Sequence, residues 1–109
     1  MLFIELPKFS ELIVELVGDD EFAIFQKELL KNPTAGTVIP GCAGLRKVRM
    51  RIPGRGKRGG ARVIYLYLEE QATIVFFYLY TKAAAEDLSA EQKKRLQKAV
   101  ITIKKEFKV

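Results

Sequence analysis

A run of basic residues near the middle of the chain has the side chains best suited to phosphate chemistry. Residues 46 to 62 contain no carboxylate, whereas the rest of the chain has 11 basic and 13 acidic residues, so the net charge of +6 arises locally. Guanidinium groups bind phosphate oxygens in bidentate pairs, and unopposed cations attract polyanions. An ordinary solvated strand surface would intersperse acids. We therefore expect a nucleic-acid partner for these eight residues: Arg46, Lys47, Arg49, Arg51, Arg55, Lys57, Arg58 and Arg62.

The remaining residues favour chemistry without a metal or cofactor. The chain has no His, and its one cysteine, Cys42, cannot form an internal disulfide, so a zinc or haem site is not expected. Without a histidine base, Cys42 is better explained as a half-buried loop residue than as a nucleophile. The carboxylates near predicted strand ends form no two-metal constellation: Glu69, Glu70, Glu86 and Asp87.

These residues are suited to metal-free RNA cleavage by the 2′-hydroxyl. The reaction needs a base for the hydroxyl, cations for the charge that develops on phosphorus, and an acid for the leaving oxygen. Cationic neighbours disfavour the protonated form of a lysine, so Lys47 or Lys57 is a candidate base, whereas arginine can only donate. Tyr80 and Lys82, at the end of the last predicted strand, are candidates for stacking on a base or donating a proton.

Three amphipathic segments predict helices that would position these residues. Apolar residues recur at helical spacing over 8–17, and again over a segment that Asp19 or Asp20 would cap and Asn32-Pro33 would end. These two helices should form a hairpin. The last helix begins at Ser89, whose spacing to Gln92 is that of a capping box.

Four segments rich in Val, Ile, Tyr and Phe predict strands, at 2–6, 45–52, 61–69 and 72–81, and residues 34–44 are predicted to be a loop. The last three strands have short connections and favour an antiparallel meander. A length of 109 residues with 49% hydrophobic content suggests one domain over 1–109. We expect an α+β fold with two N-terminal helices and a C-terminal helix on a small, mainly antiparallel twisted sheet.

Side chains alternate between the two faces of the first meander strand, which should separate the basic residues from the apolar residues of the core. Lys47, Arg49 and Arg51 should lie on one face, and Val48, Met50 and Ile52 on the other. Arg62 opens the next strand, and the glycine-rich connection between the two strands can approach phosphate closely. Together they predict a concave basic wall.

No apolar run is long enough to cross a bilayer, and the first residues lack the features of a secretory signal. We therefore expect a cytoplasmic protein with no membrane partner.

The succession of motifs resembles the RelE/HigB toxins of bacterial toxin–antitoxin modules, most closely a HigB-like branch. The shared features are a helix that ends in KNP, the loop IPGCAGLRK, then GKRGGARVIY, and LYTK followed by DLS. The resemblance covers about residues 20 to 90 and implies an endoribonuclease that cleaves messenger RNA in the ribosomal A site without metal. It also implies a cognate antitoxin, for which we expect a helix-turn-helix DNA-binding protein.

Carried over by position, the resemblance places the family's basic strand residues on Lys47 and Arg49, the following basic residue on Arg62, and the loop lysine on Lys57. It implies that Arg49 and Arg62 stabilise the phosphorane. Where RelE-type members use a further arginine and a tyrosine, this chain reads TKAAAEDLS, which leaves Tyr80 and Lys82 as substitute proton donors. RNA would be held by Arg46, Arg51, Arg55 and Arg58. The alternatives are a non-catalytic RNA-binding module and a DNA-binding regulatory module with the same fold.

Overall fold

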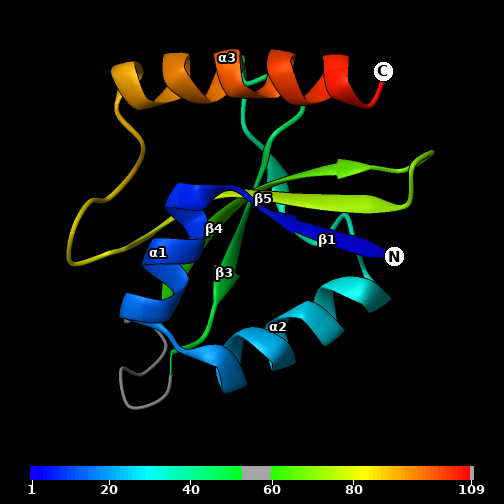
Figure 1. Ribbon diagram of the computed structural model, residues 1–109. Helices are drawn as coiled ribbons and strands as arrows, with labels where there is room; N and C mark the ends of the chain where they lie inside the picture. The colour runs from blue at the N-terminus through cyan, green and yellow to red at the C-terminus, as the bar shows by residue number, and fades with distance from the viewer. Residues whose placement is uncertain (53–59, 109) are drawn as a thin grey trace.

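The computed structural model describes residues 1–52 and 60–108, which form a mixed sheet covered on both faces by helices (Figure 1). The helices are α1 (Pro7–Leu16), α2 (Asp19–Lys31) and α3 (Ala90–Glu106). The strands are β1 (Leu2–Glu5), β2 (Thr37–Val38), β3 (Arg46–Met50), β4 (Ala61–Leu68) and β5 (Thr73–Thr81). None of the helices in these ranges is long and apolar enough to span a bilayer.

The strands are arranged in the order β1-β5-β4-β3-β2. The predicted meander of β3, β4 and β5 is confirmed as antiparallel, and β1 pairs in parallel with β5 at the opposite edge from β2. The predicted α+β class, with two N-terminal helices and one C-terminal helix on a mainly antiparallel sheet, is therefore confirmed.

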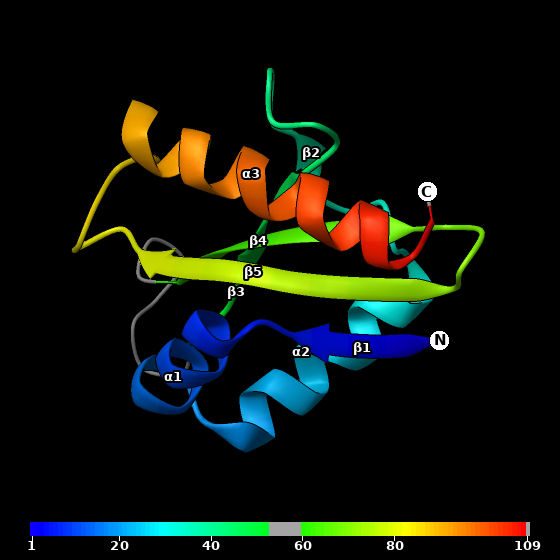
Figure 2. The same ribbon diagram turned by 45° about the horizontal axis from the view of Figure 1, so that its top comes forward.

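Two apolar clusters lie on opposite faces of the sheet. Helices α1 and α2 pack on one face through residues such as Phe9 and Phe25, which meet Phe76 of β5. Helix α3 packs on the other face, where Val100 and Ile103 join side chains of β4, β5 and the loop before β3. Figure 2 shows α3 crossing one face with α1 and α2 beyond the other. We call these the α1/α2 face and the α3 face.

Three local predictions differ from the structure. Neither Asp19 nor Asp20 caps α2: Gly18 is the N-cap, and both aspartates lie in the first turn, where their charge favours the positive end of the helix dipole. The predicted loop 34–44 contains the two-residue strand β2. Cys42 is fully buried rather than half-buried, because it packs in the apolar cluster under α3.

The hydroxyl of Tyr65 joins the end of α2 to the centre of the sheet. Tyr65 is wholly buried on β4, donates a hydrogen bond of 2.7 Å to the carbonyl of Pro33 and accepts one of 3.1 Å from the amide of Gly36. Burial raises the pKa of Tyr65, which keeps the phenol protonated as a donor.

Substitution of Tyr65 should therefore reduce stability. Tyr65→Phe leaves a carbonyl and an amide without their partner, and we expect it to lower the free energy of unfolding by about 1–3 kcal/mol. Urea denaturation of the variant measures this loss. Tyr67→Phe, on the same strand and partly exposed, is the control and should change stability by less. Equal stability of the two variants would show that the Tyr65 hydroxyl does not hold the α2 connection.

Candidate active site on the α3 face

Three adjacent strands place Arg49, Arg62 and Tyr80 side by side. Arg49 of β3 is registered opposite Arg62 of β4, and Arg62 is registered opposite Tyr80 of β5. Directly opposed residues have Cβ atoms about 4.5–5.5 Å apart. We call these three residues the Arg49–Arg62–Tyr80 row. The sequence-predicted site residues Arg49, Arg62 and Tyr80 are thus brought together.

A β-bulge in β5 puts Tyr80 on the same face as Arg62. Ile64 pairs with Tyr78 and Tyr65 with Phe76, so Phe77 is an extra residue without a counterpart on β4. Phe76 packs on the α1/α2 face, and strict alternation would send Tyr80 there too. The bulge shifts this phase, and Tyr80 joins the cluster on the α3 face.

Lys47 lies on the same face of the sheet, two residues before Arg49 on β3. It is registered opposite Ile64, which is registered opposite Tyr78, and the rings of Tyr78 and Tyr80 lie 6.2 Å apart. The predicted alternation in β3 is confirmed on its apolar side, because Val48 and Met50 pack toward α1 and α2. The strand ends at Met50, so Arg51 and Ile52 follow it rather than belonging to it.

Asp87 is a residue of this site that the sequence did not single out. Its Oδ1 lies 3.4 Å from Lys47 Nζ and accepts a 2.8 Å hydrogen bond from the amide of Leu88. The hydrogen bond from Leu88 and the nearby charge of Lys47 hold the pKa of Asp87 below its usual value. In sequence Asp87 was one of several scattered carboxylates. The motif DLS, in which Asp87 comes two residues before the cap Ser89, was the available signal.

Two polar atoms of the row are buried without a hydrogen-bond partner in the part of the chain that the structure describes. They are Nη1 of Arg62 and Oη of Tyr80. A buried donor without a partner costs about 1–3 kcal/mol, so each such group needs an explanation, and a catalytic role is one. The two atoms belong to directly opposed residues, so the unsatisfied donors are concentrated at one place on the α3 face.

The surroundings of Tyr80 keep its hydroxyl protonated. Burial raises the pKa of Tyr80, and the charge of Asp87 together with a hydrogen-bonding interaction between the two side chains raises it further, whereas the guanidinium of Arg62 acts in the opposite direction. The approach of Asp87 does not have the geometry of a full hydrogen bond, so the Tyr80 hydroxyl is only weakly held. A phenol of this kind can donate a proton but does not carry negative charge at neutral pH. This fits the predicted role of Tyr80 as a proton donor.

Two other predicted residues, Lys82 and Arg51, lie beyond the ends of the strands that form the row. Lys82 follows β5 and is exposed, and Arg51 is exposed beyond the end of β3. Gly60, the last residue of the GKRGG motif, lies so close to β3 that a Cβ there would come within 2.5 Å of the carbonyl oxygen of Met50. The loop residues Arg55, Lys57 and Arg58 lie outside the described residues, so the predicted basic wall is described only in part.

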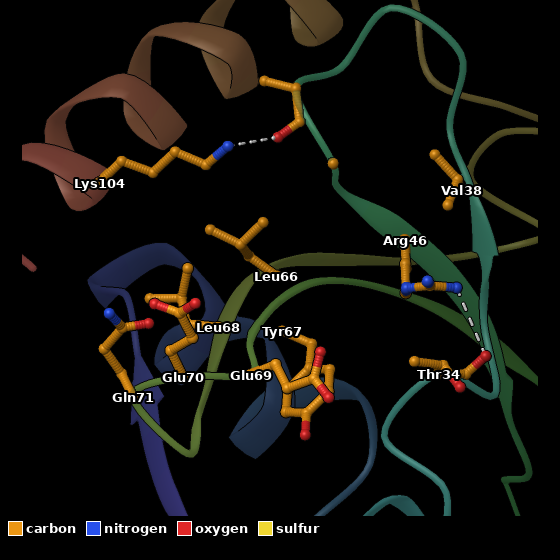
Figure 3. Close-up of a pocket in the computed structure, with 12 residues that line it drawn as sticks. Thr34, Val38, Arg46, Leu66, Tyr67, Leu68, Glu69, Glu70, Gln71 and Lys104 are labelled. Carbon is orange, nitrogen blue, oxygen red and sulfur yellow. Dashed lines mark hydrogen bonds between the residues drawn. The ribbon is translucent and has the colours of Figure 1, made fainter. Parts of the chain in front are cut away.

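The side chain of Arg46 lies away from the row and is held by hydrogen bonds to the backbone of the segment before β2. It donates to the carbonyl oxygens of Gly36 at 2.8 Å and Thr34 at 3.4 Å, and it lines a pocket of about 400 Å³ with Leu66, Glu69 and Lys104 (Figure 3). Lys104 donates to the carbonyl of Ala43. The cations of this pocket are thus engaged with the backbone, and the pocket offers less to a phosphate than the row does.

Within residues 1–52 and 60–108, no group of three or more His, Cys, Asp or Glu side chains could hold a metal ion. The side chains of the row themselves offer cations that stabilise negative charge and a phenol that donates a proton.

Comparison with solved structures supports the fold. A mutant of the E. coli toxin RelE in the free state is 18% identical, with a TM-score of 0.55, covering 78% of this chain and 86% of that one. The intact E. coli RelBE toxin–antitoxin complex contains a chain that is 12% identical, with a TM-score of 0.51, covering 72% of this chain and 97% of that one.

A family model gives the assignment. The model, described as the RelE toxin of the RelE/RelB toxin–antitoxin system, matches residues 40–107. This range is more than half of the chain and includes all of the Arg49–Arg62–Tyr80 row, Lys47 and Asp87. The chain therefore belongs to the RelE toxin family of toxin–antitoxin modules.

Proposed function

We propose that this RelE-family toxin is a ribosome-dependent, metal-independent endoribonuclease that cleaves messenger RNA in the A site and so inhibits translation. The observation that carries the proposal is the Arg49–Arg62–Tyr80 row, in which two cations and a protonated phenol lie side by side on the α3 face. That combination suits a phosphate that gains negative charge while its leaving group needs a proton.

In the proposed reaction the 2′-oxygen attacks the adjacent phosphorus as its proton passes to a base. Lys47 is ion-paired with Asp87 as an ammonium group and would act as a further cation toward the phosphorane, so of the two candidate bases, Lys47 and Lys57, we favour Lys57. Arg49 and Arg62 stabilise the charge on the phosphorane oxygens. The bond from phosphorus to the 5′-oxygen then breaks, and the leaving oxygen takes a proton from Tyr80 or Lys82. The products are a 2′,3′-cyclic phosphate and a 5′-hydroxyl, with no water consumed.

We favour Tyr80 over Lys82 as the acid because Tyr80 is registered opposite Arg62, whereas Lys82 is exposed beyond the strand. The hydroxyl of Tyr80 is shielded in the free protein, so proton transfer requires a local opening when RNA binds. Arg51, Arg55 and Arg58 would hold ribosomal or messenger RNA through phosphate contacts, and Arg46, whose guanidinium also donates to two backbone carbonyls, would contribute less.

The proposed partners are ribosome-bound messenger RNA and a cognate antitoxin in the cytoplasm. The match to a chain of the E. coli RelBE toxin–antitoxin complex supports the antitoxin. That this antitoxin is a helix-turn-helix protein, and that the chain belongs to the HigB-like branch, stay predictions from the sequence motifs.

The test is cleavage of a defined message by the purified protein with and without ribosomes. The proposal predicts cuts only with ribosomes present, at codons in the A site, with 5′-hydroxyl and 2′,3′-cyclic phosphate ends. A protein that binds ribosomes and never cuts would instead be a non-catalytic RNA-binding module, and one that binds only duplex DNA would be a regulatory module.

A further inference from the structure

We propose that Asp87 is a positioning residue of the candidate active site, which fixes the ammonium group of Lys47 beside the Arg49–Arg62–Tyr80 row. The inference rests on the proposed function and deepens it. Asp87 is an acidic side chain beside the basic residues Lys47, Arg49 and Arg62, and its proposed role is to orient Lys47 rather than to bind RNA.

The ion pair connects two parts of the chain that are distant in sequence. Lys47 is on β3 and Asp87 is in the segment between β5 and α3, 40 residues later, with Nζ and Oδ1 3.4 Å apart. By contrast, the pairs Lys8–Glu11 and Glu91–Arg95 each join neighbouring turns of one helix. The Lys47–Asp87 pair therefore ties the segment after Tyr80 to the strand that carries Arg49.

The carboxylate of Asp87 is oriented before any substrate arrives. Its Oδ1 accepts the backbone N–H of Leu88, and Leu88 is buried in the cluster under α3. The same hydrogen bond, with the charges of Lys47 and Lys93, lowers the pKa of Asp87, so the group is an anion at neutral pH. A fixed anion of this kind can hold a flexible lysine in one place.

The pair is better suited to positioning than to stabilising the fold. The side chains of Lys47 and Asp87 are 32% and 57% exposed, and exposed ion pairs contribute little to folding stability. Small displacements of a reacting group, however, can lower a rate by about 100-fold. Loss of the Asp87 charge should thus affect cleavage far more than it affects melting.

Asp87 also acts on the proton donor of the row. The groups that influence the phenol of Tyr80 are Asp87 from the following segment, Arg62 from β4 and Tyr78 from β5. The charge of Asp87 raises the pKa of Tyr80 and Arg62 lowers it, so removing the Asp87 charge should lower the pKa of Tyr80. This effect can be measured without any assay of activity.

The decisive variant is Asp87→Asn, with Glu86→Gln as the matched control. Asparagine keeps an oxygen for the Leu88 N–H but loses the charge, whereas Glu86→Gln removes the same charge from the neighbouring exposed residue. We expect Asp87→Asn to lower kcat for ribosome-bound message about 10- to 100-fold with KM and melting temperature nearly unchanged. The control should keep wild-type cleavage, and Asp87→Glu should recover part of the loss.

Two NMR measurements on the free protein give an independent readout. In Asp87→Asn the order parameter of the Lys47 Cε group should fall and the titration of the Tyr80 ring carbon should move to lower pH, while Glu86→Gln changes neither. An Asp87→Asn protein that cuts as fast as wild type, or faster, would overturn the inference, as would an unchanged Lys47 order parameter. If the wild-type protein does not cut at all, the proposed function fails, and the NMR results still decide whether Asp87 orders Lys47.

Discussion

Replacing Arg62 by alanine should abolish message cleavage while leaving the protein folded. Arg62 lies at the centre of the row, between Arg49 and Tyr80, and its Nη1 has no hydrogen-bond partner among the described residues. This nitrogen is therefore available to a phosphate oxygen. Losing one donor aimed at developing charge costs about 100- to 1,000-fold in rate. Single-turnover cleavage of ribosome-bound message by the purified variant measures the loss.

The control for Arg62→Ala is Arg95→Ala, which removes an exposed cation on α3 that pairs with Glu91. It changes the net charge equally but lies outside the row, so cleavage should stay within a few-fold of wild type. Melting temperatures of both variants show whether each is folded. Near wild-type cutting by a folded Arg62→Ala protein would remove Arg62 from the site.

Replacing Tyr80 by phenylalanine should have the second large effect. The variant loses only the hydroxyl, which is buried and has at most a weak interaction with Asp87 among the described residues, so stability should change little. If that hydroxyl protonates the leaving oxygen, cleavage should fall about 100- to 10,000-fold. The two measurements are the melting temperature and the rate of cleavage on ribosomes.

Tyr78→Phe is the matched control for Tyr80→Phe. Tyr78 lies two residues away on the same strand and face, and its hydroxyl accepts a hydrogen bond from Gln92 Nε2 at 3.4 Å. It does not oppose Arg62, so its loss should change cleavage only a few-fold. If Tyr80→Phe cuts as fast as Tyr78→Phe, the phenol is not the acid, and Lys82 becomes the candidate.

Much of the fold was predictable because local patterns agree with it. The helical spacing of apolar residues and the capping box of Ser89 and Gln92 are both present in the structure, in which each residue of the box bonds to the other's backbone. Alternation in β3 correctly predicted that Lys47 and Arg49 lie on one face of the sheet and Val48 and Met50 on the other. These signals depend on neighbouring residues and do not require knowledge of the tertiary arrangement.

Features that depend on contacts between distant segments were not predictable. The parallel pairing of β1 with β5 and the short edge strand β2 are set by partners far along the chain. The bulge at Phe77 reverses the face on which Tyr80 lies, and no glycine marks it. Asp87 meets Lys47 only because the segment before α3 passes near β3. The bulge and the course of this segment position two residues of the candidate site, Tyr80 and Asp87.

The central claim, attack by the 2′-hydroxyl on a phosphate held at the Arg49–Arg62–Tyr80 row, can be tested with one altered message. Ribosomes are programmed with a message carrying a single 2′-deoxynucleotide immediately 5′ of the scissile phosphate in the A site. The account predicts that wild-type protein leaves this message intact at that position, while it cuts the all-ribose message to give a 2′,3′-cyclic phosphate. Cleavage of the 2′-deoxy message at the same position would contradict the account, because the nucleophile would then come from elsewhere.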